Sequence, residues 1–328
     1  MKTYLKINAR SGTTRFGLIA LLCALVAAPA VGSSSEFTAN AAPSTVSVFA
    51  TGLNNPRGLT FGPDGNLYVA EGGIGGSNST EGCCEQAPLP TGPHTGSITG
   101  SRVSKIDANG LRTTAVDNLP SSQTSAASGR LVSGAADVAF IGDTLYVLLS
   151  GAGCSHGVPQ VPALPNGVIR VNADGTLDMI ANLGAFQMAN PVANPAADFD
   201  PDGVPYSMIA VHGDLYVTEA NHGELDKVAT SGHMSRIVDI SASQGHIVPT
   251  AMTYYNGNFY VGNLGVFPIT DGSSKILKIT PSGQITVAAQ VLDHRSRRRF
   301  RSQRSNVCAG EHHRESFPNP RDWQGGPN

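Results

Sequence analysis

The stretch Pro56-Arg57-Gly58-Leu59-Thr60-Phe61-Gly62-Pro63-Asp64-Gly65-Asn66-Leu67-Tyr68-Val69-Ala70-Glu71 decides the fold. It contains two short apolar-rich segments on either side of a Pro-Asp-Gly-Asn turn, which is the signal of an antiparallel hairpin. Two more short segments of the same kind follow at 102–106 and 111–116, with a turn at 108–110 between them. The stretch and its continuation therefore predict one four-stranded antiparallel sheet.

The same order of segments and turns recurs three more times along the chain. Equivalent tyrosines mark the four copies, at Tyr68, Tyr146, Tyr216 and Tyr260, and the intervals between them are 78, 70 and 44 residues. The shortest interval matches the roughly 40–45-residue period of a bare propeller blade. We therefore expect an all-β chain with a β-propeller domain over 44–292.

A further apolar segment at 45–50 precedes the first copy. In a closed propeller such a segment is expected to be the outermost strand of the last blade. Propellers have about 4–8 blades, so four copies and this N-terminal closing strand predict a propeller that is incomplete.

The insertions that lengthen the repeats fall on one side of the expected fold. First-to-second and third-to-fourth strands are joined by tight turns. All insertions lie between second and third strands or between copies, at 72–100, 119–134, 150–166, 184–205 and 262–273. In a propeller these two kinds of connection emerge on the same face, and loops on a rigid scaffold are where binding usually resides. We therefore expect a small-molecule or oligomeric ligand on this long-loop face.

Both ends of the chain differ from the body in composition. Residues 1–30 combine a basic leader, an apolar run at 16–26 and small residues of A-x-A type, the layout of a secretory signal peptide that is too short to span a membrane. A linker at 31–43 follows. Residues 293–328 hold eight of the sixteen arginines and no strand alternation. They predict a disordered basic tail, either a polyanion-binding segment or the product of out-of-frame translation.

Export and charge limit the classes of partner. A cleaved signal peptide predicts a secreted or periplasmic protein with no membrane span after cleavage. The body between 43 and 292 carries 10 basic and 19 acidic side chains. Because a phosphate backbone is bound by clustered Lys and Arg, this acidic balance argues against a nucleic-acid partner.

Several motifs resemble one known family. The first repeat is similar to NHL repeats in general. The segments Cys84-Glu85-Gln86-Ala87-Pro88, Leu119-Pro120-Ser121-Ser122-Gln123 and Glu219-Ala220-Asn221-His222 resemble the ScyD/ScyE family over about 45–292. The resemblance implies an exported propeller with six blades, and it supplies no catalytic residues.

Two groups of residues are candidate metal sites. Asp198, Asp200 and Asp202 stand at alternate positions before Gly203, as in a loop that binds Ca²⁺. Ile209 occupies the twelfth position, where an EF-hand requires Glu, so an EF-hand is excluded and a solvated turn is the alternative. The second group lies at or just after the ends of the second strands of the copies. It could ring another divalent metal, or instead hydrogen-bond neighbouring blades: Glu71, Glu219, Asn221, His222, Glu224, Asp226 and Asn263.

Cysteines and histidines also lie in the long loops. A Cys84–Cys154 disulfide would join two of these loops, and Cys83–Cys154 is the alternative pairing. His94 and His156 share the same loops, so a Cys/His metal site is conceivable without a C-x-x-C motif. The candidates for the ligand-binding face are Arg57, Glu71, His94, His156, Glu219, Asn221, His222 and Asn263.

Three functions remain in order of preference. The first is an exported binding or interaction propeller that is not an enzyme. The second is a metal-dependent hydrolase or lyase of the lactonase type, with the metal held by Glu71, Glu219, Asn221 and Asn263. The third is a quinone-dependent sugar dehydrogenase, which is disfavoured because no cluster of Arg and Lys is evident for the cofactor carboxylates.

Overall fold

The computed structural model describes residues 46–159, 164–266 and 269–290. The expected signal peptide, linker and basic tail lie outside these residues. All strands and helices belong to the unit that begins at Val48. Within the described residues, no helix is both long enough and apolar enough to cross a membrane.

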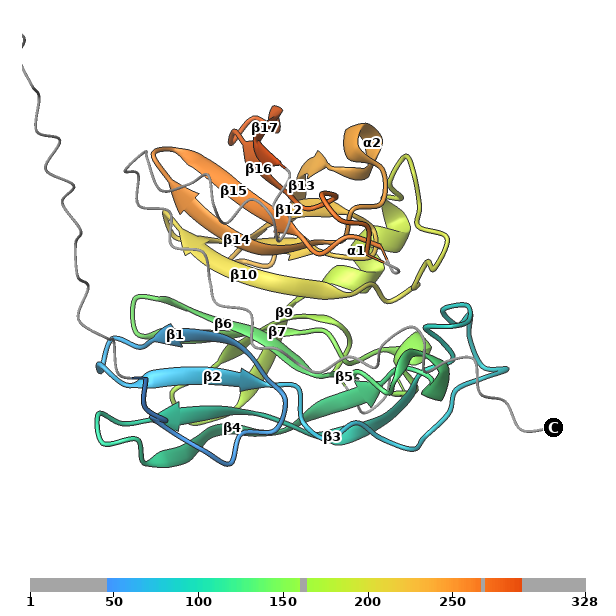
Figure 1. Cartoon of the computed structure of the whole chain (residues 1–328). Coiled ribbons are helices and arrows are strands. Elements are labelled where there is room, and N and C mark those ends of the chain that lie inside the picture. The colour runs from blue at the N-terminus through green and yellow to red at the C-terminus, as the bar shows by residue number, and fades with distance from the viewer. Residues whose placement is uncertain (1–45, 160–163, 267–268, 291–328) are drawn as a thin grey trace, which may run out of the picture. The chain divides into compact units, whose positions relative to one another are not determined.

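Four antiparallel sheets make up this unit (Figure 1). The first two sheets contain β1 (Pro56–Phe61), β2 (Leu67–Glu71), β3 (Thr95–Ile106), β4 (Arg112–Gln123) and β5 (Val132–Ser133), then β6 (Ala135–Ile141), β7 (Thr144–Leu149), β8 (Gly167–Val171) and β9 (Leu177–Asn182). The other two contain β10 (Pro205–Val211), β11 (Asp214–Glu219), β12 (Glu224–Ala229) and β13 (Met234–Asp239), then β14 (Pro249–Tyr255), β15 (Asn258–Asn263), β16 (Lys275–Ile279) and β17 (Ile285–Gln290). Each predicted repeat thus forms one sheet whose strands pair in chain order, and the all-β prediction is confirmed.

Local turn chemistry explains why each repeat folds into hairpins. In the β1–β2 turn, Gly65 has a φ of 76°, a conformation that glycine adopts without a Cβ clash. Its N–H donates to the carbonyl of Gly62 at 3.0 Å, and the Asp64 carboxylate accepts from the N–H of Asn66 at 3.1 Å. An Asp-Gly turn of this kind holds two short strands in register.

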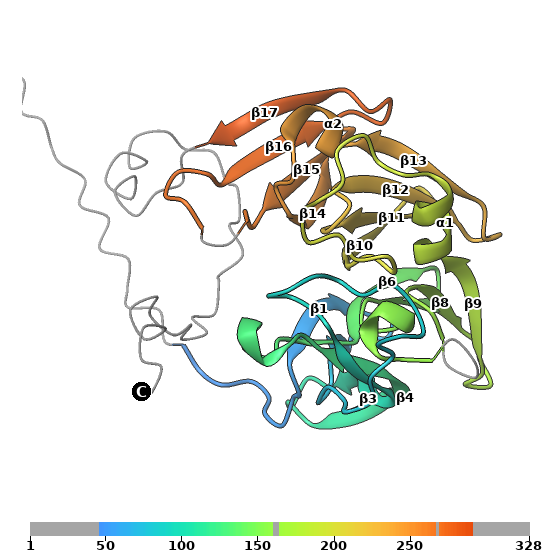
Figure 2. The ribbon, with the colours of Figure 1, turned by 90° about the vertical axis from the view of Figure 1, so that its right-hand side faces the viewer.

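The sheets pack against one another through their innermost strands. β1 contacts β6, β6 contacts β10, and β10 contacts β14, as Figure 2 shows from the end that carries the long loops. Neighbouring residues of a strand serve opposite interfaces: Val147 lies in the apolar cluster between the first and second sheets, and Leu148 in the cluster between the second and third. This period-two burial on both faces is the packing of propeller blades.

The segment before β1 differs from its prediction. No strand is formed over 46–50 in the described structure. The carbonyl oxygen of Phe49 nevertheless lies against Gly110, in the β3–β4 turn, at 2.2 Å from an ideal Cβ position. Ile180 of β9 lies in the same way against Gly232, and Ile237 of β13 against Gly283. Phe49 therefore lies where the outermost strand of a preceding blade would lie. No described strand pairs with the segment around it.

The first sheet is longer than the sequence pattern suggests. β3 and β4 extend beyond the predicted 102–106 and 111–116, and Thr95 pairs with Gln123 at the far end. Residues at the edges of the predicted insertions 72–100 and 119–134 are therefore strands. Register shifts between 97 and 104 interrupt the alternation of this hairpin, which is why the sequence pattern does not reveal it.

Candidate functional site

The long connections gather at one end of the sheets. They include β2–β3, β7–β8 and β9–β10, and the last of these begins with helix α1 (Leu183–Ala189). These connections lie toward the right of Figure 1, whereas the short hairpin turns lie toward the left. We call this end, with the long connections, the long-loop face. The candidate residues that end second strands, Glu71, Glu219 and Asn263, lie here as well.

A disulfide joins two of the long loops. Cys84, from the β2–β3 loop, is bonded to Cys154, at the start of the short 3₁₀ helix η2 (Cys154–His156), with Cα atoms 6.2 Å apart. The hydroxyl of Thr80 donates to the carbonyl of Cys154 beside this bond. Cys83 is exposed and remains a free thiol. The first and second sheets are thus covalently linked on the long-loop face.

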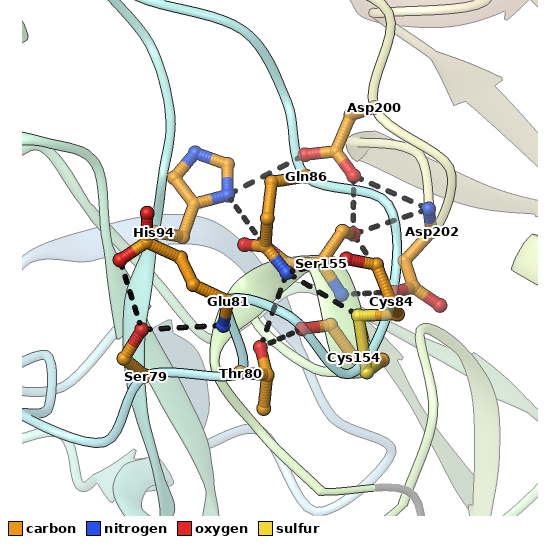
Figure 3. Close-up of a disulfide and its surroundings, with 10 residues drawn as sticks. All are labelled: Ser79, Thr80, Glu81, Cys84, Gln86, His94, Cys154, Ser155, Asp200 and Asp202. Atoms are coloured by element: carbon orange, nitrogen blue, oxygen red, sulfur yellow. Dashed lines mark hydrogen bonds and ion pairs between the residues drawn. A yellow bond between two sulfur atoms is a disulfide. The ribbon is translucent and has the colours of Figure 1, made fainter.

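Two histidines and one aspartate from three different loops meet next to this disulfide. Figure 3 shows two of them, His94 and Asp200, beside the Cys84–Cys154 bond. His94 immediately precedes β3, His156 belongs to η2, and Asp200 lies in the loop before β10. The Oδ2 atom of Asp200 is 3.5 Å from Nδ1 of His94 and 3.3 Å from Nε2 of His156. All three side chains are at most 3% exposed. We call these three residues the His–Asp cluster.

Each histidine has further polar contacts. The Nδ1 atom of His94 lies 3.2 Å from the carbonyl of Ser155. His156 contacts the hydroxyl of Ser122 through Nδ1 at 3.1 Å and the carbonyl of Gly203 through Nε2 at 3.2 Å. The two imidazole rings stack with centroids 4.6 Å apart. Both side chains are therefore fixed between loops of the first, second and third sheets.

Electrostatics keep the His94 imidazole neutral. Burial, together with the neighbouring His156, lowers the pKa of His94 to about 4. The Asp200 carboxylate acts in the opposite direction and does not overcome the burial. A neutral imidazole leaves one ring nitrogen with a lone pair that can accept a hydrogen bond or bind a metal.

The three predicted calcium ligands do not converge on one point. Asp200 and Asp202 both turn toward Ser155: its hydroxyl lies 2.5 Å from Oδ1 of Asp200, and its N–H donates to Oδ2 of Asp202 at 2.7 Å. Asp198 instead contacts Nε2 of His246 at 3.3 Å. The structure therefore brings Asp200 to the two histidines rather than to Asp198.

The predicted ring of polar residues at the strand ends is used for backbone hydrogen bonds. Glu71 accepts from the N–H of Asn54 at 2.5 Å and from Nε of Arg102 at 2.9 Å. Asn263 accepts from the N–H of Lys275 at 2.7 Å and donates to the carbonyl of Ile247 at 3.1 Å. Each of these two residues holds a loop of its own sheet.

The corresponding residues of the third sheet support the loop that carries Asp200. Glu219 accepts from the backbone N–H groups of Val204 and His222. Asn221 accepts from the N–H of Asp200 at 2.8 Å, and Nε2 of His222 lies 2.9 Å from the Asp200 carbonyl. These side chains thus position the His–Asp cluster. Among the described residues, that cluster is the one group of His, Cys, Asp and Glu side chains with metal-ligand spacing.

Arg57 lies between the innermost strands, next to Pro56, which pairs with Glu71 at the long-loop end of the first sheet. Its guanidinium group is 4.8 Å from the ring centroid of Tyr206, in β10. Its Nη1 atom also lies 3.5 Å from the hydroxyl of Ser133. Arg57 therefore contacts both the first and the third sheets.

Glu224 and Asp226, two of the predicted ring residues, form a buried pair of acids on β12. Nε of Arg236 donates to Oε2 of Glu224, while both carboxylate oxygens of Asp226 are buried without a hydrogen-bond partner. Burial raises the pKa of Asp226 well above its ordinary value, and the adjacent Glu224 raises it further. The sequence does not reveal that these two acids are buried, since acids at alternate positions on a strand usually face water.

A pocket of about 300 Å³ opens in the loops of the fourth sheet. Its polar lining includes His246, Asn263 and Lys275, and its apolar lining includes Ile247 and Val266. Asp198 contacts His246 at its edge. The long-loop face therefore offers a concave surface with polar groups as well as the buried His–Asp cluster.

No family model matches the sequence, and no curated protein matches it either. Among solved structures, the chain is similar to a gluconolactonase from Xanthomonas campestris, with 14% identity over 75% of this chain and 66% of that chain and a TM-score of 0.43. It is also similar to a catalytically inactive virginiamycin B lyase from Staphylococcus aureus with quinupristin, with 14% identity over 71% of this chain and 54% of that chain and a TM-score of 0.40. A protein of unknown function from Bacteroides thetaiotaomicron has 13% identity over 72% of this chain and 43% of that chain, with a TM-score of 0.41. The chain spans less than two thirds of each of these three proteins.

Proposed function

We propose that this chain is an exported β-propeller binding protein of the ScyD/ScyE type that takes a small-molecule or oligomeric ligand on its long-loop face. One observation carries the proposal: loops from three different sheets are fastened together there by the Cys84–Cys154 disulfide and the His–Asp cluster. Loops that are ordered before binding lose little conformational entropy when a ligand arrives, so the binding free energy is retained. A face used only for chain connection would not need such cross-links.

The disulfide also supports export. Disulfides persist in oxidising compartments and are rare in the cytosol, and Cys84 and Cys154 are joined in the structure. This agrees with the signal-peptide pattern of residues 1–30. We infer a secreted or periplasmic location.

The position of Phe49 supports a larger ring. Its carbonyl contacts Gly110 as Ile180 contacts Gly232, in the place of an outermost strand. A blade would then precede the first sheet in space. The six-bladed plan of the ScyD/ScyE family provides such a blade, and we propose that plan for the complete propeller.

Charge favours a neutral or cationic ligand. The body has an excess of acidic side chains, which repel an anion at low ionic strength. The pocket around His246 combines polar and apolar lining, as small-molecule sites do. Neutral oligosaccharides, cyclic peptides and cationic aromatic compounds are therefore the classes to test first.

Lactonase-type hydrolysis is less well supported. The side chains expected to hold a catalytic metal, Glu71, Glu219, Asn221 and Asn263, hydrogen-bond backbone groups of the loops next to them. They are engaged in holding loops rather than directed to one shared point. Binding therefore remains the proposed function.

The test is a ligand screen followed by mapping. The full secreted chain is screened by native mass spectrometry against the three ligand classes, and hydrogen exchange is then measured with and without the bound compound. We expect protection in 72–94, 150–159, 190–204 and 264–274. The hairpin turns at 62–66 and 142–143 serve as internal controls. Protection confined to those turns, or no binding by any of the three classes, would contradict the proposal.

A further inference from the structure

The His–Asp cluster has the composition of a transition-metal site. It offers two imidazole nitrogens and one carboxylate oxygen, from His94, His156 and Asp200, and these atoms all lie within 4.8 Å of one another. Zinc is bound in proteins by this combination of donors at about 2.0–2.2 Å. Ca²⁺ and Mg²⁺ take oxygen donors instead. We propose that the cluster binds one divalent transition-metal ion of the zinc type, which fastens the long loops of three sheets together.

The distances in the cluster suit a tetrahedral ion. Two donors bound at about 2.05 Å with a tetrahedral angle are about 3.3 Å apart. The Oδ2 atom of Asp200 is 3.3 Å from Nε2 of His156 and 3.5 Å from Nδ1 of His94. The two rings stack with an angle of 19° between their planes, so they must tilt apart for both lone pairs to reach one ion.

The carboxylate supplies the second observation. The Oδ2 atom of Asp200 is buried and has no hydrogen-bond partner, although Asp200 is only 1% exposed. A buried polar atom without a partner is energetically unfavourable, and a buried anionic one more so. A ring nitrogen of each histidine lies within 3.5 Å of this oxygen. A cation at that point satisfies it.

Surrounding groups orient the three donors as they do in known metal sites. The other ring nitrogen of His156, Nδ1, can donate to the hydroxyl of Ser122 at 3.1 Å. In that tautomer Nε2 carries the lone pair, and it lies 3.3 Å from Oδ2 of Asp200 and 3.2 Å from the Gly203 carbonyl. The other carboxylate oxygen of Asp200, Oδ1, is held by the Ser155 hydroxyl at 2.5 Å. Asn221 fixes the backbone of Asp200 through its N–H.

The burial of the His–Asp cluster indicates that the ion has a structural role. Structural zinc sites are closed and four-coordinate, whereas catalytic sites keep one position open to water or substrate. The carbonyl oxygens of Ser155 and Gly203 each lie 3.2 Å from a donor nitrogen, so a protein oxygen is at hand for the fourth position. The ion would then stabilise the folded state by mass action. This inference is independent of the ligand proposed for the long-loop face.

The direct test uses zinc and cobalt as probes on the full secreted chain. After dialysis against EDTA and removal of the chelator, Zn²⁺ is added, and native mass spectrometry and thermal unfolding are recorded. We expect one ion per chain and a higher Tm. Co²⁺ in the same protein should give the intense visible absorption of tetrahedral nitrogen and oxygen ligation without a thiolate charge-transfer band. Such a band would assign the ion to a cysteine and overturn the proposal.

Variants locate the ion. Asp200→Asn and His156→Gln should each weaken zinc binding by at least about tenfold and remove the Tm increase. His246→Gln is the matched control, because His246 also faces an aspartate, Asp198, outside the cluster; it should bind zinc as the parent protein does. The double variant His312→Ala/His313→Ala should also bind zinc as the parent protein does. That result would exclude the two C-terminal histidines as zinc ligands. Failure of the parent protein to take up zinc, or full zinc affinity in both cluster variants, would refute the site.

Discussion

Oδ2 of Asp137 accepts a hydrogen bond from the backbone N–H of Met208 at 2.8 Å, and so joins the innermost strand of the second sheet to that of the third. The other carboxylate oxygen, Oδ1, accepts from the N–H of Val138. On the opposite side, Gly58 of β1 lies so close that an added Cβ would be 1.8 Å from Oδ1. One buried carboxylate thus organises three sheets below the long-loop face.

Asp137 is expected to make stability depend on pH. Burial raises its pKa from 3.8 to about 6, and the nearby Arg57 only partly opposes this. The folded state therefore holds the proton more tightly than the unfolded state, and the free energy of unfolding falls as pH rises from about 4 to about 6. Two pKa units correspond to about 3 kcal/mol as an upper value.

Asp137→Asn cannot ionise and should lack this fall. Urea unfolding of the parent and variant at pH 4.5, 5.5 and 7 measures the difference, since other titrating groups are common to both. A constant difference between the two proteins across this range would show that Asp137 titrates normally in the fold.

Gly58→Ala tests the close approach itself. The added methyl group overlaps the Asp137 side chain and comes within 2.8 Å of its Cα, so we expect destabilisation of about 1–3 kcal/mol by overpacking. Gly262→Ala is the matched control, because its nearest neighbour is 4.0 Å from the Cβ position. Equal unfolding midpoints for the two variants would contradict the packing described for the sheet centre.

The disulfide should contribute measurably to stability. Cys84 and Cys154 are 70 residues apart in sequence, and cross-links over such loops stabilise by about 2–4 kcal/mol. Cys84→Ser/Cys154→Ser is expected to lose this amount in chemical unfolding. Cys83→Ser should leave stability unchanged, because Cys83 is exposed and free. A large loss in the Cys83 variant would indicate the alternative pairing.

Asp226→Asn is expected to stabilise the protein at neutral pH. Because burial holds the pKa of Asp226 well above its ordinary value, the folded state binds this proton more tightly than the unfolded state, and keeping the acid in its buried place at neutral pH lowers stability. Asparagine carries no ionisable group, so the free energy of unfolding at pH 7 should rise. The exposed Asp143→Asn serves as control and should change stability little. A stability loss in Asp226→Asn would mean that the carboxylate is ionised in the fold.

The hairpins could be read from the sequence because their signals are local. Turn residues such as Asp64 and Gly65 fix each hairpin within a few positions, and the period-two alternation places the side chains. β3 begins at Thr95 and not at 102. The sequence pattern misses this extension because bulges interrupt the alternation. The strand expected at 45–50 is not formed, because a strand also requires a neighbour that these positions do not have among the described residues.

The candidate site shows the limit of local reasoning more clearly. His94 and His156 were recognised in their loops and Asp200 in a calcium-like motif, yet as members of different groups. Their meeting depends on how three sheets pack, which no short motif encodes. Ser155, which contacts Asp200, has no sequence signal, and Ser122, which contacts His156, is noted only as part of a family-like motif.

The claim that the long loops form one rigid surface is tested most directly by amide hydrogen exchange of the oxidised, unliganded full chain. Several loop N–H groups have buried or part-buried acceptors, among them those of Gly75, Ser155, Asp200 and His222. The account predicts that these amides exchange as slowly as those of β7 and β11, and that reduction of the disulfide accelerates Gly75 and Ser155 first. Exchange of these amides as fast as that of the exposed turn at 142–143 would contradict a preformed binding face.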